Sequence, residues 1–185
     1  MLKHAFWLLM IAGSACALPS QAESTKQSFE SCSMITSEYL TILQLMSRGF
    51  ERDALINNLP GISDDARQRV DSLFTTVESD GLVETYSRIN SEYARCAKGV
   101  YDSRGTPADD TREAHFHFCA GENKVRYEIL LAAVIGADQT EVAEQLAAQH
   151  QPAVPALYEL YQSEGALQVF DELASELKRC LNIPV

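Results

Sequence analysis

The stretch VPALYELYQSEGALQVFDELASELKRC, residues 154–180, decides the fold because residues 70–96, VDSLFTTVESDGLVETYSRINSEYARC, are a second version of it. At a constant offset of 84 residues the two stretches share 8 identities in 27 positions. The shared pairs are Val70/Val154, Leu73/Leu157, Ser79/Ser163, Gly81/Gly165, Ser91/Ser175, Glu92/Glu176, Arg95/Arg179 and Cys96/Cys180. These identities predict a duplicated structural unit in which each copy ends near a cysteine.

Apolar residues in both copies recur with the period of an amphipathic helix. The first helix of each copy has its apolar face at Val70, Leu73, Phe74 and Val77, and at Val154, Leu157, Tyr158 and Tyr161. Gly81 and Gly165 then interrupt the pattern, which is typical of the left-handed residue that ends a helix. The second helix has its face at Tyr86, Ile89, Tyr93 and Cys96, and at Phe170, Leu173, Leu177 and Cys180.

The residues upstream of each copy supply two more helices. Cys32, Ile35, Tyr39, Ile42 and Met46 follow one another at steps of 3, 4, 3 and 4, and Gly49 ends that helix. At an offset of 87 residues, Cys119, Leu130 and Gly136 correspond to Cys32, Leu43 and Gly49. A short amphipathic helix with Ala54, Leu55 and Leu59 follows in the first unit, and Asp138 opens its counterpart in the second. Ser63 is a good N-cap for the next helix, which carries Val70. The sequence therefore predicts an all-α fold of two tandem units with about four helices each.

The expected boundaries follow from these patterns. Residues 29–98 form helical unit 1 and residues 115–185 form helical unit 2. Residues 99–114 are predicted to be an exposed linker because they contain Gly99, Gly105 and Pro107 and no apolar period. Residues 23–28 are polar and are expected to be disordered. The two units either pack side by side or fuse into one bundle.

The first residues resemble a bacterial secretory signal peptide. Lys3 precedes an apolar run over residues 5–12, and small residues at Ser20 and Ala22 fit a cleavage site after Ala22. A cut after Ala17 is the alternative. The run is shorter than the roughly 20 apolar residues of a spanning helix. We expect residues 1–22 to be removed and the protein to be periplasmic or secreted, without a transmembrane segment.

The charge balance is strongly acidic. Without Lys3 the chain keeps 14 basic and 26 acidic residues, a formal net charge of −12. A field of this sign repels nucleic acid and anionic lipid and steers a basic protein towards the surface. If the protein has a protein partner, a basic one is therefore favoured, and nucleic acid is not.

Four cysteines remain after the expected cleavage: Cys32, Cys96, Cys119 and Cys180. An even number in an exported chain predicts two disulfides. The spacing is 64 residues from Cys32 to Cys96 and 61 from Cys119 to Cys180, and this match favours pairing within each unit. Pairing of Cys96 with Cys119 across the linker is the rival connectivity.

The run His115-Phe116-His117-Phe118-Cys119 is the local cluster that could coordinate a metal ion. In an extended strand the two imidazoles and the thiol would point to one side, whereas in a helix they would diverge. A disulfide at Cys119 would also remove the sulfur ligand. His115 and His117 therefore stay candidates for a metal or catalytic role, and no cofactor is predicted.

The acidic and basic residues that the two copies share stand three apart. Glu92 and Arg95, and likewise Glu176 and Arg179, can pair across one helical turn. A place at the helix end or in contacts between units is the structural reason for them to recur.

The chain contains no GxSxG, HExxH, phosphate-binding glycine loop or calcium loop. We expect an exported, soluble, non-enzymatic helical protein that binds another envelope or secreted protein, for instance as an inhibitor or immunity factor. One alternative is an envelope enzyme or metal-binding protein that uses the His115/His117 region. Another is a structural envelope protein anchored through lipidated Cys16.

Overall fold

The computed structural model describes residues 27–58 and 62–184. These residues form eight α-helices and no strand, which confirms the all-α prediction. The helices are α1 (Phe29–Ser47), α2 (Arg52–Asn58), α3 (Asp64–Asp80), α4 (Leu82–Arg104), α5 (Arg112–Val134), α6 (Gln139–Gln145), α7 (Ala153–Glu164) and α8 (Ala166–Leu181). The predicted signal peptide, residues 1–22, lies outside the described residues.

Side-chain caps fix where several helices begin. The Ser63 hydroxyl accepts from the Ala66 amide at the start of α3, and the Asp138 carboxylate accepts from two amides at the start of α6. Both predicted starts are confirmed. Ser28 belongs to the stretch that was expected to be disordered, but it caps α1 through a reciprocal pair of hydrogen bonds with Ser31.

Glycine supplies the sharp break between the last two helices of each unit. Gly81 and Gly165 have φ values of 91° and 82°, with ψ values of 163° and 175°. Each residue is at once the C-cap of one helix and the N-cap of the next. The backbone reverses there without a loop, as the helix–glycine–helix pattern predicts.

The linker is shorter than the expected 99–114. Helix α4 continues to Arg104 and α5 begins at Arg112, so residues 105–111 connect them. The extension of α4 has a clear cause, because Ala97 and Val100 are buried and continue the helical period of Tyr93. Thr111 caps α5 by accepting from the Ala114 amide.

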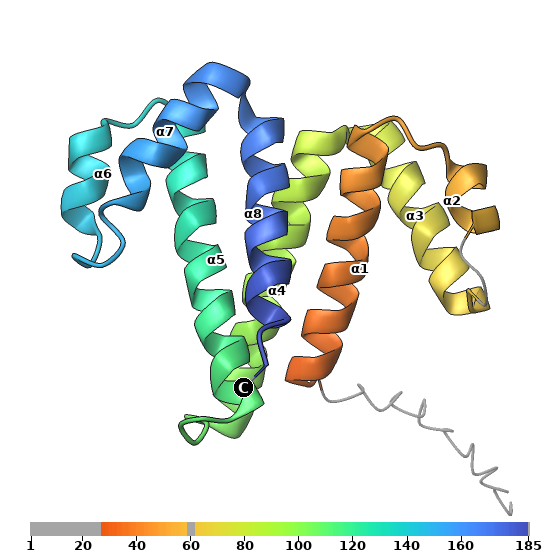
Figure 1. Ribbon diagram of the computed structural model, residues 1–185, viewed down its shortest axis with the longest axis horizontal. Helices are drawn as coiled ribbons and strands as arrows, with labels where there is room; N and C mark the ends of the chain where they lie inside the picture. The colour runs from red at the N-terminus through yellow and green to blue at the C-terminus, as the bar shows by residue number, and fades with distance from the viewer. Residues whose placement is uncertain (1–26, 59–61, 185) are drawn as a thin grey trace, which may run out of the picture.

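Helices α1, α4, α5 and α8 assemble into one central bundle. Helices α1 and α4 pack together in the first unit, and α5 and α8 pack together in the second. Between the units α4 contacts α5 and α1 contacts α8, so the two units are fused into a single bundle. The pairs α2–α3 and α6–α7 flank this bundle on opposite sides (Figure 1).

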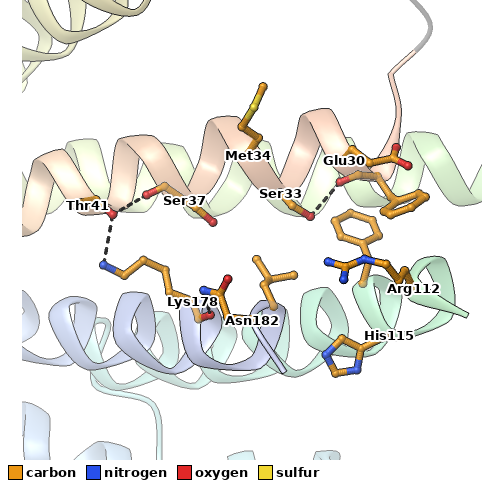
Figure 2. Close-up of a pocket in the computed structure, with 12 residues that line it drawn as sticks. Glu30, Ser33, Met34, Ser37, Thr41, Arg112, His115, Lys178 and Asn182 are labelled. Carbon is orange, nitrogen blue, oxygen red and sulfur yellow. Dashed lines mark hydrogen bonds between the residues drawn. The ribbon is translucent and has the colours of Figure 1, made fainter. Parts of the chain in front are cut away.

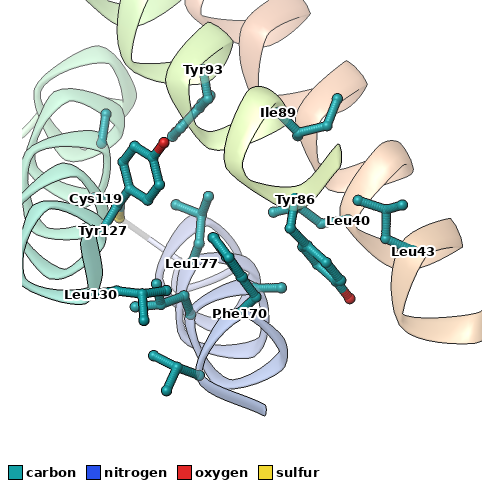
Figure 3. Packing of buried hydrophobic residues seen from close by; sticks show 14 of the residues in the cluster. Leu40, Leu43, Tyr86, Ile89, Tyr93, Cys119, Tyr127, Leu130, Phe170 and Leu177 are labelled. Carbon is teal, nitrogen blue, oxygen red and sulfur yellow. The ribbon is translucent and has the colours of Figure 1, made fainter. Parts of the chain in front are cut away.

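Equivalent positions of the two units fill the core. Leu43 and Leu130 are both fully buried, and Val70 and Val154 are 1% and 0% exposed. Tyr86 of α4 stacks on its equivalent, Phe170 of α8, with ring centroids 5.4 Å apart. Figure 3 shows these rings where the faces of α4 and α8 meet.

Two disulfides join the first and last helix of each unit. Cys32 pairs with Cys96 and Cys119 with Cys180, at Cα–Cα distances of 6.0 and 5.8 Å. The predicted pairing is confirmed, and the rival Cys96–Cys119 bond does not form. Among the helices described, none has the length and apolar character needed to cross a bilayer.

Candidate functional site

The bundle carries two grooves at equivalent places on its surface. The first, the α1–α8 groove, has a volume of about 480 Å³ and is lined by Phe29, Glu30, Ser33, Met34, Ser37, Thr41, Arg112, His115, Phe116, Lys178, Leu181 and Asn182. The second, the α4–α5 groove, has a volume of about 540 Å³ and is lined by Ser91, Ala94, Arg95, Ala97, Lys98, Tyr101, His117, Ala120, Gly121, Lys124, Tyr127, Glu128 and Leu131.

The two sequence offsets relate the grooves residue by residue. Met34 of α1 corresponds to Gly121 of α5, and Lys178 of α8 corresponds to Ala94 of α4. Each groove thus lies between the first helix of one unit and the last helix of the other. The shape recurs, but the side chains differ, so the grooves offer different chemistry.

Small and apolar side chains form the floor of the α4–α5 groove. Ala94, Ala97, Ala120 and Gly121 contribute only small side chains to the lining, and a Cβ added at Gly121 would have no neighbour within 4 Å. Tyr101 is an exposed aromatic residue at the same groove. Such a floor accepts apolar side chains from a ligand with little rearrangement.

The apolar surface continues along α5 beyond the groove. Leu131, which lines the groove, is 37% exposed, and Val134 and Ile135 are 46% and 81% exposed. The spacing of three and four residues places all of them on one face. Contiguous exposed apolar residues of this kind mark interaction surfaces more often than isolated ones do.

The rim of the α4–α5 groove is charged but balanced. Arg95 lies 3.6 Å from Glu92, Lys98 lies 2.5 Å from Asp102, and Lys124 lies 2.6 Å from Glu128. Each pair joins residues three or four positions apart on one helix. The rim therefore presents alternating signs and does not itself select an anionic or a cationic ligand.

A polar network joins α1 to α8 beside the α1–α8 groove, and two of its members, Thr41 and Lys178, line that groove. Gln44 donates to the Asp171 carbonyl at 3.0 Å and to the Ser175 hydroxyl at 2.9 Å, and it accepts from Lys178. Lys178 also donates to Thr41 (Figure 2). Burial lowers the pKa of the Lys178 ammonium; Asp171 opposes this effect and Arg48 adds to it. In the α4–α5 groove, Leu131 occupies the position that corresponds to Gln44.

The two candidate histidines point to different places because the run 115–119 is helical. His115 Nε2 lies 2.8 Å from the Cys180 carbonyl oxygen and lines the α1–α8 groove. His117 lines the α4–α5 groove, and its ring contacts those of Tyr101 and Phe116. Burial lowers the pKa of His117, and Glu113 partly opposes that effect. The structure does not bring the two imidazoles together as one site.

Among the described residues, three potential metal ligands do converge: His115, Cys119 and Cys180. Both sulfurs belong to a disulfide, so the oxidised chain offers one imidazole at this point. This arrangement provides neither a tetrahedral metal site nor a nucleophile with its base.

The repeated Glu/Arg positions behave differently in the two units. Glu92 pairs with Arg95 as predicted, and both side chains are largely exposed. Glu176 instead contacts Arg126 of α5 at 2.9 Å, an interaction that joins two helices of unit 2. The prediction of a pair with Arg179 is wrong there, because Arg126 lies within reach of the carboxylate.

Sequence reasoning missed both grooves. The signal for the α4–α5 groove was the clustering of Ala94, Ala97, Ala120 and Gly121 on helical faces, but which helices face each other depends on the assembled bundle. No family model matches this sequence, and no curated protein or solved structure is significantly similar to it.

Proposed function

We propose that the protein is an exported, non-enzymatic binding protein that holds a segment of another envelope or secreted protein in the α4–α5 groove. The observation that carries the proposal is the groove itself, with its small-residue floor and the exposed apolar face of Leu131, Val134 and Ile135 beside it. An amphipathic helix laid in such a groove buries its apolar side chains against the floor.

The charge of the whole molecule favours a basic partner. The rim of the groove is balanced, so long-range steering is set by the net charge of −12 expected after cleavage. Steering of this kind accelerates association and weakens with ionic strength. An inhibitor or immunity factor against a basic envelope hydrolase or toxin is a function of this class.

Two features support export and a duplicated origin. Disulfides persist in oxidising compartments, and both units contain one. The identities at an offset of 84 residues coincide with equivalent helices, equivalent disulfides and equivalent grooves. We infer that one ancestral unit was duplicated and that the copies diverged, one keeping a polar interface and the other an open apolar one.

A pair of equivalent substitutions tests the groove. Gly121→Trp places an indole in the α4–α5 groove, whereas Met34→Trp places the same side chain at the corresponding position of the α1–α8 groove, where Met34 is 64% exposed. The oxidised protein serves as bait in envelope extract, at low and high salt, and captured proteins are quantified by mass spectrometry.

We expect one stoichiometric partner that binds wild type and Met34→Trp equally, is released by salt and is lost from Gly121→Trp by at least tenfold. A photo-crosslinking residue at Tyr101 should then attach to that same partner. Equal capture by both variants, or loss confined to Met34→Trp, contradicts the assignment of the groove.

The alternative of an envelope enzyme has one specific observation in its favour, the buried Nε2 atom of His117, which has no hydrogen-bond partner among the described residues. A His117→Ala variant that loses a measurable activity would support it. His115 is not its partner, because the two rings lie at different grooves.

A further inference from the structure

Three metal-ligating atoms meet between the start of α5 and the end of α8. His115 Nε2 and the sulfurs of Cys119 and Cys180 all lie within 4.8 Å of one another. His115 and Cys119 are one helical turn apart, with Nε2 3.5 Å from Sγ. We propose that reduction of the Cys119–Cys180 disulfide turns this cluster into a binding site for one thiophilic metal ion, such as Zn²⁺.

The geometry suits a tetrahedral ion. Zn–S bonds of about 2.3 Å and Zn–N bonds of about 2.0 Å place the ligand atoms of a tetrahedral site roughly 3.5 to 3.8 Å apart. His115 Nε2 already lies 3.5 Å from the Cys119 sulfur. The two sulfurs are bonded to each other and must move apart after reduction, and they lie on two helices that pack against each other. Three protein ligands leave a fourth position for water.

The step needs an external dithiol reductant. The dithiol supplies two electrons and two protons to the Cys119–Cys180 disulfide and is itself oxidised to a disulfide, so two thiols result. A divalent ion then displaces one proton from each thiol and binds two thiolates. On His115 the ion takes the place of the Nε2 proton, so the neutral ring keeps its proton on Nδ1 and gives up its hydrogen bond to the Cys180 carbonyl.

The cluster is bordered by two hollows. His115 lines the α1–α8 groove, and Cys119 and Cys180 line a separate hollow between α5 and α8. His115 and Cys180 are partly exposed, so an ion can approach them from these hollows, whereas Cys119 is buried.

Unit 1 supplies the matched control within the same chain. Its disulfide, Cys32–Cys96, has nearly the same Cα–Cα distance, 6.0 Å, but Ser28 stands where unit 2 has His115. After reduction unit 1 offers two thiols and no imidazole. The proposal predicts that the two halves differ in metal affinity although their disulfides are equivalent.

The test titrates Co²⁺ and Cd²⁺ anaerobically into reduced residues 23–185 and follows the thiolate charge-transfer absorption. A Cys32→Ser/Cys96→Ser variant keeps only the unit 2 ligands, and a Cys119→Ser/Cys180→Ser variant keeps only the unit 1 thiols. We expect the first to bind one ion per chain at least tenfold more tightly than the second. Adding His115→Ser to the first should remove that advantage.

Equal affinities of the two cysteine variants, or an unchanged affinity after His115→Ser, would overturn the proposal. Circular dichroism accompanies each titration to cover loss of the fold on reduction. If the reduced chain loses helicity, Zn²⁺ should restore it in the variant that keeps His115 and not in the His115→Ser variant. Failure to restore it also counts against the site. Neither result depends on the protein partner proposed above.

Discussion

At the scale of single residues, a buried tyrosine hydroxyl without a partner is the clearest source of instability. Tyr93 is 1% exposed, and its hydroxyl makes no hydrogen bond within the described residues. Tyr127 is also buried, but its hydroxyl lies 2.7 Å from the Ser87 hydroxyl. The two residues therefore have similar rings in one core and opposite hydrogen-bonding states.

Replacing Tyr93 or Tyr127 with phenylalanine should change the free energy of unfolding in opposite directions. Tyr93→Phe removes a polar atom that is desolvated without compensation, so the free energy of unfolding should rise by about 1 kcal/mol. Tyr127→Phe removes a hydrogen bond and should lower it by about 1 kcal/mol. Chemical denaturation of both variants measures the difference, and a lower stability for Tyr93→Phe would show that its hydroxyl is satisfied.

Burial of Tyr93 also makes the free energy of unfolding depend on pH. Burial raises the pKa of Tyr93, whereas in the unfolded chain a tyrosine titrates near 10. Above pH of about 10 the unfolded state loses a proton that the folded state keeps, so stability is full below that pH and falls as the pH rises towards the folded pKa. The decline should be shallower in Tyr93→Phe. A parallel decline in both proteins would contradict the assignment.

At the scale of helices, replacing two glycines with alanine should have opposite effects on stability. Gly165 separates α7 from α8, and Gly121 lies within α5 at the α4–α5 groove. Gly165 has φ of 82°, and nothing lies within 4 Å of a Cβ built on it, so Gly165→Ala should destabilise by about 1–3 kcal/mol through backbone strain alone. Gly121 is helical and equally open, and Gly121→Ala should stabilise by up to about 1 kcal/mol through helix propensity. Thermal unfolding of the two variants gives the comparison, and equal effects would be inconsistent with the strain at Gly165.

Helix identity was largely predictable because local chemistry determines it. Ser63, Asp138, Gly81 and Gly165 act at short range, so their effects are visible in the sequence. The end of α4 differs from the prediction because Gly99 and Pro107 are typical helix breakers, whereas the buried Ala97 and Val100 continue the helical period past Gly99. The Glu176–Arg126 contact could not be predicted from the sequence, because it joins residues on two different helices.

At the scale of the whole molecule, the arrangement of the units was the part that the sequence left open. Amphipathic helices bury their apolar faces equally well in two separate units or in one bundle, and the cysteine spacing is compatible with both. The choice depends on how α4 meets α5 and α1 meets α8. The grooves follow from that choice, so neither could be placed before the bundle was known.

Fusion into one bundle predicts how the protein unfolds when a disulfide is removed. Closing a loop of 64 or 61 residues stabilises by about 4 kcal/mol in the chain-entropy model. Cys32→Ala/Cys96→Ala should therefore lower the free energy of unfolding by roughly that amount, and so should Cys119→Ala/Cys180→Ala. Because the helices of each unit pack against the other unit, either loss should weaken the whole bundle, and unfolding should remain one cooperative transition. Denaturant unfolding followed by both circular dichroism and tyrosine fluorescence checks this. Two separate transitions, with half of the helical signal surviving the first, would mean that the stapled units fold independently and that the contacts between them contribute little.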